Sequence, residues 1–219
     1  MIVTPLLKVA YNFNGNKNDE SGYAHNLTGT ATIVDGNIGQ CANFNGSQYL
    51  SSNNIDLSDT DKLTICFWIK FSKTSLQIIA ENSVNFNNNN NAFLIDHSEY
   101  GSFGAIQFSD HATQGYNISY TSKSYNDGKW HFVAITSDRS QNALNQTSIY
   151  VDLVKDTILH SEYRSDLPGN YSTFPLFLGS RNNSQYFFNG QISRFHIYKK
   201  ILSLTDIQRI YECSTPLNG

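Results

Sequence analysis

The sequence predicts an all-β fold in which two antiparallel sheets stack as a sandwich. Short apolar or alternating runs recur along the 219 residues and are separated by Gly, Asn, Asp and Ser. Aromatic residues are abundant, with 14 Phe, 13 Tyr and 2 Trp, whereas charged residues make up only 15%. Because a single stretch has helical periodicity and the length suits one all-β unit, we expect one domain over residues 1–219.

The predicted strands are short runs rich in β-branched and aromatic residues, each bounded by turn-forming residues. They cover residues 63–71, 76–81, 103–108, 116–121, 130–138, 147–153, 175–180 and 190–198. In the first run, successive side chains such as Phe67 and Trp68 point to opposite faces, and both faces are apolar. Residues 63–71 are therefore predicted to form a central strand that is covered on both sides.

Tight turns are predicted where an aromatic residue runs directly into Asn-Gly, at residues 12–15, 43–46 and 187–190. Asn and Gly both tolerate positive φ, so this pair favours a hairpin turn. The preceding aromatic side chain is expected in the core. Asp-Gly pairs at residues 34–37 and 126–130 predict the same kind of turn.

One short helix is predicted near the C-terminus, over residues 203–212. Ser203 is followed three residues later by Asp206, an arrangement close to a capping box. The apolar residues that share one face of this helix are Leu204, Ile207, Ile210 and Tyr211. The segment is expected to close the sandwich and not to form a second domain.

Charge and hydropathy argue against two kinds of partner. The formal net charge is −3 and no Lys/Arg cluster forms a basic stripe, so no nucleic acid is expected. No apolar run approaches the roughly 20 residues that span a bilayer, so no membrane insertion is expected. Residues 1–15 lack the pattern of a signal peptide. The chain as given is expected to be soluble; an extracellular location then requires a trimmed export signal or release as part of a particle.

Three cysteines, Cys41, Cys66 and Cys213, cannot all pair within one chain. Buried free thiols are the preferred interpretation, and one disulfide with one leftover thiol is the alternative. No Cys-x-x-C pair occurs, which argues against a zinc site.

Several segments resemble those of a known family and keep its order. They read LLKVAYNFNGNKNDESGYAHN, GQCANFNGSQYLSSNN, LTICFWIKF, DGKWHFVAITSD and PLFLGSRN…FFNGQISRFHIYKKILSLTDIQRIYE. Over about residues 6–212 the chain resembles the laminin G-like domains of the concanavalin A-like lectin/glucanase superfamily. The resemblance implies a jelly-roll sandwich whose loops or concave face bind glycans or proteins. It also implies, as in many members, a calcium ion near the chain ends.

The residue patterns of hydrolases are not found in the chain. A retaining glycosidase needs two carboxylates about 5–5.5 Å apart, and the resemblance implies the pattern Glu-x-Asp-x-x-Glu for a glucanase of this class. Neither that pattern nor the Gly-x-Ser-x-Gly of many esterases occurs. The sequence therefore predicts a protein that is not an enzyme, with a degenerate glycoside hydrolase as an alternative.

The loop over residues 14–22 is the candidate calcium site, because calcium prefers carboxylate, amide and carbonyl oxygens. Asn16, Asp19 and Gly22 are the predicted ligands. A polar turn that needs no metal is the alternative. Where the family often has an acidic pair, this chain has Ser193 and Arg194, so an acidic ligand is lost and a positive charge stands nearby. Pairing of Arg194 with Asp19 or Glu20 would replace the cation.

The candidate glycan contacts are polar and aromatic residues that we expect in loops. Sugars stack on ring faces, and planar polar groups bind their hydroxyls. The candidates are His97, Tyr100, His111, Tyr116, Arg181, Asn183 and Tyr186. The alternative for the tyrosines is that they cap the edge of the core.

Taken together, these features predict a non-catalytic recognition module that binds a glycan and serves in surface attachment or adhesion. We expect it outside the cell or on a virion surface, with a glycan or a cell-surface or virion protein as partner. A structural protein–protein interaction domain of a virion or extracellular assembly, with no sugar binding, is the main alternative. The sequence leaves the oligomeric state open.

Overall fold

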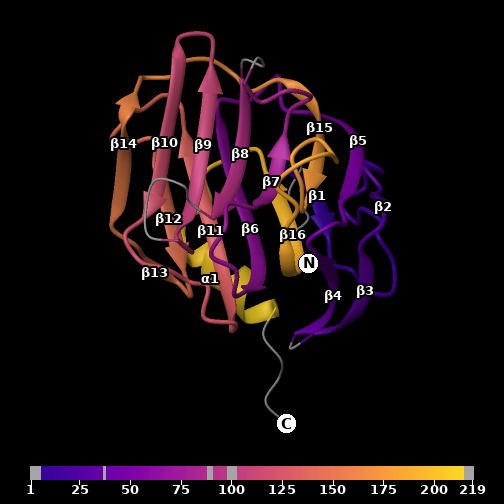
Figure 1. Cartoon of the computed structure of the whole chain (residues 1–219). Helices are drawn as coiled ribbons and strands as arrows, with labels where there is room; N and C mark the ends of the chain where they lie inside the picture. The colour runs from indigo at the N-terminus through magenta and orange to yellow at the C-terminus, as the bar shows by residue number, and fades with distance from the viewer. Residues whose placement is uncertain (1–5, 37, 88–90, 98–102, 215–219) are drawn as a thin grey trace.

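Two antiparallel sheets and one short C-terminal helix make up the computed structural model, which describes residues 6–36, 38–87, 91–97 and 103–214 (Figure 1). The predicted all-β jelly-roll sandwich is confirmed. The first sheet runs in the order β13 (Val154–Lys155), β12 (Thr147–Val151), β11 (Trp130–Asp138), β6 (Lys62–Phe71), β16 (Asn189–Tyr198), β4 (Gly39–Asn45) and β3 (Thr32–Gly36), with β1 (Leu7–Tyr11) paired to β16. The second sheet runs in the order β14 (Ile158–Arg164), β10 (Gly115–Thr121), β9 (Ile106–Ala112), β8 (Ala92–His97), β7 (Ile78–Asn82), β15 (Thr173–Leu178), β5 (Leu50–Asp56) and β2 (Thr28–Gly29).

Strand β6 lies at the centre of the first sheet, between β11 and β16, as its two apolar faces predicted. Ile65 pairs with Ile135 of β11 on one side and with Ile197 of β16 on the other. All three side chains are buried in the core between the sheets. The opposite face of β6 carries Trp68, which belongs to a second apolar cluster outside the sandwich.

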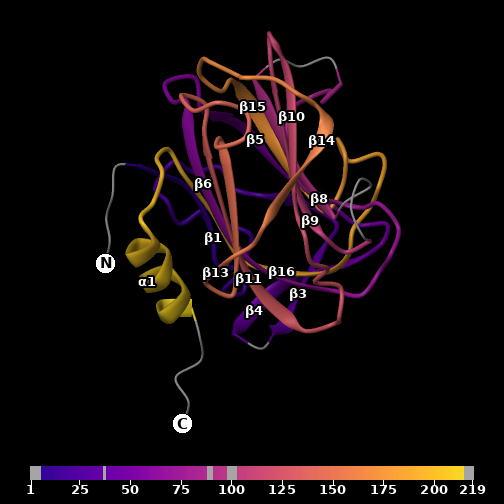
Figure 2. The same ribbon diagram turned by 90° about the vertical axis from the view of Figure 1, so that its left-hand side faces the viewer.

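Helix α1 (Leu204–Ser214) covers this outer cluster (Figure 2). The ring of Tyr211 stacks on Trp68 with centroids 5.3 Å apart, and the Trp68 indole N–H donates to Ser214 Oγ at 2.8 Å. Ser203 caps the helix as predicted, because the Asp206 amide donates to Ser203 Oγ. The Asp206 carboxylate accepts from the Ser203 hydroxyl, whereas in a full capping box it would accept from the backbone amide of that residue. Leu204 was predicted on the apolar face but is 51% exposed, since it lies in the first turn beyond the edge of the cluster. No helix of the described residues is long and apolar enough to cross a membrane.

The three Phe-Asn-Gly segments bury their aromatic side chains as predicted, but none of them closes a hairpin. The second one ends β4, and the following strand β5 lies in the other sheet. The third one leads into β16, where Gly190 pairs with Phe44. The rings of Phe44 and Phe188 meet edge to face, with centroids 5.8 Å apart. Gly15 and Gly46 have positive φ (76° and 89°), so the first two segments bend the chain without determining which sheet the next strand joins. Gly190 of the third segment has no positive φ and lies within β16.

The two Asp-Gly turns differ from each other. Strands β3 and β4 form a hairpin in which Gly36 pairs with Gly39, as predicted, although Asn37 lies outside the described residues. The segment 126–130 is not a hairpin turn, because it connects β10 of the second sheet to β11 of the first. Gly128 has φ 76° there, and its amide donates to the Phe71 carbonyl at 3.0 Å.

All three cysteines are free, as the preferred interpretation held. Cys41 and Cys66 are buried, whereas Cys213 is exposed, so the expectation of burial is wrong for that residue. Cys213 lies on the last turn of α1, on a side of the helix that does not face the sheet.

A buried polar cluster joins the two sheets at one end of the core. Arg139, which follows β11 of the first sheet, forms an ion pair with Asp110 of β9, and both side chains are fully buried. The Asp110 carboxylate also accepts hydrogen bonds from the Tyr171 hydroxyl at 2.8 Å and the Gln146 amide at 2.7 Å. Arg139 donates as well to the carbonyl of His111 at 2.9 Å. The backbone of β9 is thereby tied to the opposite sheet directly behind His111.

Candidate functional site

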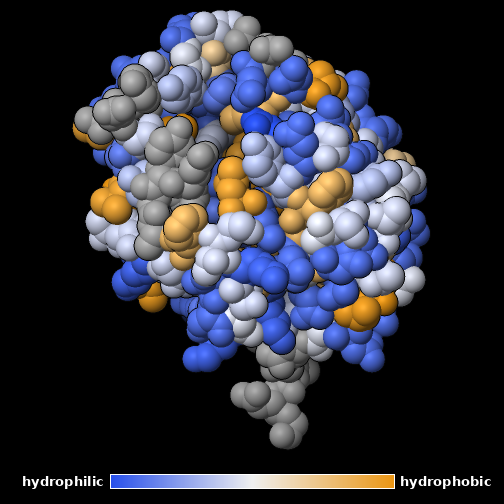
Figure 3. Space-filling view, in the orientation of Figure 1, coloured by the Kyte–Doolittle hydropathy of each residue, from blue (hydrophilic) through white to orange (hydrophobic). Residues whose placement is uncertain are grey.

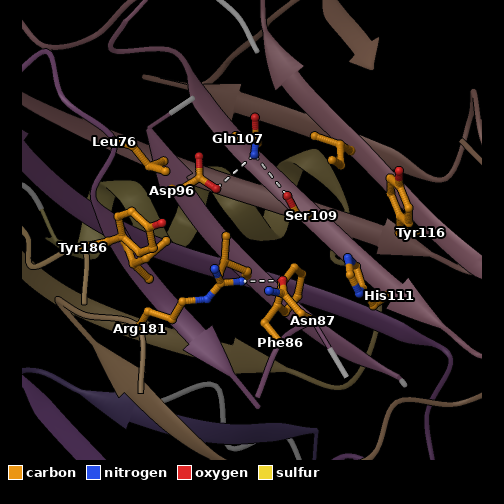
Figure 4. Close-up of a pocket in the computed structure, with 13 residues that line it drawn as sticks. Leu76, Phe86, Asn87, Asp96, Gln107, Ser109, His111, Tyr116, Arg181 and Tyr186 are labelled. Atoms are coloured by element: carbon orange, nitrogen blue, oxygen red, sulfur yellow. Dashed lines mark hydrogen bonds between the residues drawn. The ribbon is translucent and has the colours of Figure 1, made fainter. Parts of the chain in front are cut away.

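A cavity of about 280 Å³ opens on the outer face of the second sheet. Figure 3 shows apolar side chains exposed near the middle of one face of the molecule, with polar ones around them. The side chains that line the cavity come from strands β7 to β10 and from the segments around residues 86 and 181–186 (Figure 4). This cavity is called the first cavity below.

Strand register explains why these side chains meet. Residues two apart on a strand share a face, so Gln107, Ser109 and His111 of β9 all point outward. Cross-strand pairing then sets Asp96 of β8 opposite Gln107, and Tyr116 of β10 opposite His111. Neighbouring strands lie about 4.8 Å apart, so the paired side chains form one continuous surface.

A row of rings forms one wall of the first cavity. The His111 ring lies 4.0 Å from the Phe86 ring and 5.3 Å from the Tyr116 ring, measured between centroids. Burial lowers the pKa of His111 to about 4, so the imidazole is neutral at physiological pH. The wall thus combines aromatic surface with an uncharged group that can donate or accept a hydrogen bond.

A polar network forms the floor of the first cavity. The side-chain amide of Gln107 donates to the Asp96 carboxylate at 3.0 Å and to Ser109 Oγ at 3.1 Å (Figure 4). All three side chains are buried. Their mutual hydrogen bonds fix the position of each oxygen before any ligand arrives.

Arg181 supplies a cation at the edge of the first cavity. Its guanidinium donates to the Asn87 side-chain oxygen at 3.1 Å and lies 5.8 Å from the centre of the Tyr186 ring. A tight loop holds both residues, because the Arg181 amide donates to the Gln185 carbonyl at 2.8 Å. Tyr186 has φ 51°, a conformation that bulky residues rarely adopt. Such strain is common at binding sites, where the surrounding structure maintains it.

Four of the seven predicted glycan contacts lie together in the first cavity. They are His111, Tyr116, Arg181 and Tyr186. They come from two segments that are far apart in the sequence, and the fold brings these segments to one face. Tyr100 lies outside the described residues.

His97 and Asn183 do not reach this cavity. His97 was expected in a loop but is the last residue of β8; it alternates with Asp96 and points into the core. It is fully buried and stacks on Phe71 with centroids 4.9 Å apart. Asn183 turns toward β5, where its side-chain amide donates to Ser51 Oγ at 3.4 Å. His111 was also expected in a loop but lies in β9, whereas Tyr116, at the start of the predicted strand 116–121, lies in β10.

Sequence reasoning missed Phe86, Asn87, Gln107 and Ser109 as residues of the site. Extending the predicted strand 103–108 to Ala112 would have placed Gln107 and Ser109 on the same face as His111. Phe86 and Asn87 lie in a loop after β7, and no sequence pattern relates that loop to β9.

Two of the three predicted calcium ligands, Asp19 and Asn16, already have hydrogen-bond partners on their side-chain oxygens, and no hydrogen bond among the described residues bears on the third, Gly22. One oxygen of Asp19 accepts hydrogen bonds from the amides of Ala10 and Ser21, and the other from the Ser21 hydroxyl and the His25 amide. A carboxylate has about four lone-pair sites, so all of them are engaged. The Asn16 side-chain oxygen is likewise bound, by the Asn18 amide at 2.8 Å.

Two further observations bear on calcium. Within the part of the chain that the structure describes, no group of three or more His, Cys, Asp or Glu side chains is arranged to hold a metal. Arg194 forms none of the ion pairs found among those residues, so it does not pair with Asp19 or Glu20. Calcium binding stays a prediction of the family resemblance.

Solved structures similar to this one share its fold at low sequence identity. Domain 4 of AbnA, a GH43 extracellular arabinanase from Geobacillus stearothermophilus, solved with arabinotriose, matches with a TM-score of 0.69 at 18% identity, covering 94% of this chain and 98% of that one. The binding domain of botulinum neurotoxin DC matches with a TM-score of 0.72 in its complex with rat synaptotagmin II and of 0.70 in its complex with SialylT. Both neurotoxin matches are 16% identical, and each covers 97% of this chain but only 52% of the neurotoxin domain.

Sequence comparison gives the family. No curated protein sequence matches the chain significantly. The model of the concanavalin A-like lectin/glucanases superfamily matches residues 44–208, which include the four predicted contacts in the first cavity. This match spans most of the chain and agrees with the two-sheet sandwich that the structure shows. The chain therefore belongs to the concanavalin A-like lectin/glucanase superfamily.

Proposed function

We propose that this protein is a non-catalytic recognition module that binds a glycan in the first cavity. The carrying observation is the row of rings at Phe86, His111 and Tyr116 beside the fixed polar network of Asp96 and Gln107. Ring faces offer apolar surface to the C–H patches of a sugar, and carboxylate and amide oxygens accept its hydroxyls. A mainly apolar pocket with a few placed polar groups is the usual form of a ligand site.

Binding without hydrolysis is the chemistry that the lining favours. Asp96 is the one carboxylate among the described residues that line the first cavity. A glycosidase needs two, one on each side of the scissile bond. The Asp96 carboxylate is also engaged by Gln107, which suits a fixed acceptor better than a mobile acid or nucleophile. A degenerate hydrolase stays the alternative, and the second carboxyl group that it would need is Glu81 in the adjoining cavity.

The similar structures support both kinds of partner that the sequence suggested. The arabinanase domain was solved with arabinotriose, and the neurotoxin binding domain with SialylT and with synaptotagmin II. A glycan is our first choice because of the ring wall. A protein partner is the alternative, since Tyr186 and Val84 are each more than 40% exposed beside the site. We place the protein outside the cell or on a particle surface, where such partners occur.

A glycan array tests the proposal most broadly. The labelled protein is applied with calcium and with EDTA, alongside Tyr116→Ala and the control Tyr23→Ala, which changes an exposed tyrosine of the N-terminal loop. We expect Tyr116→Ala to weaken binding about fivefold, since loss of a ring contact is worth about 1 kcal/mol. The control should bind as the unaltered protein does.

Three outcomes of the array are decisive. Absence of binding both with calcium and with EDTA contradicts the glycan proposal. Binding that both tyrosine variants retain contradicts the assignment to the first cavity. Loss of binding in EDTA supports a calcium requirement. Equal binding with calcium and with EDTA contradicts such a requirement.

A further inference from the structure

A second cavity of about 220 Å³ adjoins the first one. The two share Phe86, Asn87 and Arg181 as a common wall. Beyond this wall the lining of the second cavity is almost entirely polar, and includes Glu81, Asn182, Ser184 and Gln185. Its apolar surface is confined to Val84 and to the shared Phe86 among the described lining residues. The two cavities therefore lie side by side across this shared wall and differ in their chemistry.

Glu81 gives the second cavity a buried carboxyl group. The side chain is fully buried at the end of β7, and one carboxyl oxygen accepts a hydrogen bond from the Ser83 hydroxyl. The other oxygen, Oε2, has no hydrogen-bond partner among the described residues. Arg181 Nε lies 4.0 Å from it, too far for a hydrogen bond. A buried polar atom left without a partner is costly, so a group that supplies one is favoured at this position.

The chemistry around Glu81 selects the kind of group. Burial raises the pKa of Glu81, which favours the neutral acid, while the nearby Arg181 opposes this. A hydroxyl matches the carboxyl in either protonation state, since it both donates and accepts hydrogen bonds. A ligand carboxylate would lie beside the Glu81 carboxyl group at the floor of the second cavity. The Arg181 guanidinium, which could attract such a group, already donates a hydrogen bond to Asn87. Neutral, hydroxyl-rich units therefore fit best.

We infer that the second cavity is a subsite for a neutral sugar unit, so that the ligand is a neutral oligosaccharide of at least two units spanning both cavities. This inference rests on the proposed function of the first cavity. One unit stacks on the rings near His111, and the next reaches the Glu81 carboxyl directly or through a water. The shared wall at Phe86 and Arg181 lies beneath the bond that joins the two units.

The test compares sugars of different length and charge by calorimetric titration. The probes are arabinose and arabinotriose, glucose and maltotriose, and lactose with its acidic counterpart sialyllactose. We expect at least one neutral trisaccharide to bind at least tenfold more tightly than its own monosaccharide, and lactose to bind more tightly than sialyllactose. The variants are Glu81→Gln, Glu81→Leu and Ser184→Phe, the last filling the second cavity from its exposed rim.

Each variant has a distinct expected result. Glu81→Gln keeps a donor and an acceptor, so trisaccharide affinity should stay within about threefold. Glu81→Leu and Ser184→Phe should each reduce trisaccharide affinity to that of the monosaccharide while leaving monosaccharide binding unchanged. Ser184→Phe keeps the inference testable even where Glu81→Leu lowers the melting temperature.

The failures of the two proposals are distinguishable. One result overturns the second subsite alone. In that result Tyr116→Ala weakens sugar binding, but affinity does not rise with the length of the sugar and does not respond to Glu81→Leu or Ser184→Phe. Tighter binding of sialyllactose than of lactose overturns the neutral class. Absence of binding by every sugar of the panel overturns the proposed function and this inference together.

Discussion

At the scale of the residue, Asp19 orders the loop that follows β1. Its carboxylate accepts four hydrogen bonds, three of them from backbone amides at residues 10, 21 and 25. A charged acceptor strengthens each of these bonds relative to a neutral one. One side chain thereby satisfies the polar backbone of a loop that has little regular structure. From the sequence alone, the Asp19 carboxylate had suggested a calcium ligand.

Replacing Asp19 with Ala should lower the free energy of unfolding by about 2 kcal/mol, because charge-assisted hydrogen bonds are lost and amides are left without partners. Thermal melts with calcium and with EDTA should show the same loss, because protein groups donate all four of these hydrogen bonds. Asp35→Ala, at an exposed residue of β3, is the matched control and should have little effect. A loss seen only when calcium is present would instead establish an ion in this loop.

Glu81 should make stability depend on pH in an unusual direction. Burial raises its pKa in the folded state, so the folded protein binds the proton more tightly than the unfolded chain does. This contribution is fully present below the unfolded pKa and is lost as the pH rises through the folded value. Relative to the unaltered protein, Glu81→Gln should therefore gain stability as the pH rises above the ordinary pKa value of about 4.5, as followed by chemical denaturation. Glu20→Gln, at an exposed residue, is the control; equal pH profiles for the protein and Glu81→Gln would contradict the account.

At the scale of the element, β16 shows why a glycine is needed inside a strand. A Cβ on Gly190 would lie 2.4 Å from the Lys70 carbonyl oxygen and 2.6 Å from the Phe188 ring. Gly190 sits where β16 pairs with β4 on one side and β6 on the other. The Phe-Asn-Gly segment that looked like a turn signal therefore serves close strand packing at this position.

Gly190→Ala should destabilise the protein by about 1–3 kcal/mol, the usual cost of forcing extra volume into a packed region. The next residue provides the control, because Gln191 is only half buried and Gln191→Ala removes atoms without creating a clash. Urea unfolding of both variants measures the difference. A Gly190→Ala protein as stable as the unaltered one would show that β16 does not approach β6 this closely.

At the scale of the whole molecule, the sequence alone predicted the features that depend on local side-chain spacing, namely the two apolar faces of β6 and the N-terminal cap of α1. The apolar faces predicted a central strand, and the cap at Ser203 predicted a closing helix. Turn chemistry was less informative, since Asn-Gly bends the chain without selecting a sheet. The exposure of Leu204 likewise depends on where the sandwich ends and not on helical spacing.

The candidate site could be predicted in part for the same reason. His111, Tyr116, Arg181 and Tyr186 were found as residue types suited to sugars, and the fold gathers them. Gln107 was missed because the predicted strand ended at residue 108, which hid that Gln107 and His111 share one face of β9. No local sequence pattern determines which strands that are distant in sequence pair with each other.

The measurement that tests the central claim most directly is mapping of backbone amide chemical shifts during titration with the tightest-binding sugar of the panel. The account predicts that the largest changes fall on β8, β9 and β10 and on residues 181–186, with further changes near Glu81 for a trisaccharide. Residues of α1 should be unchanged, because the helix covers the opposite sheet. Changes confined to α1 and the first sheet, or to the loop around Asp19, would contradict a binding site on the outer face of the second sheet.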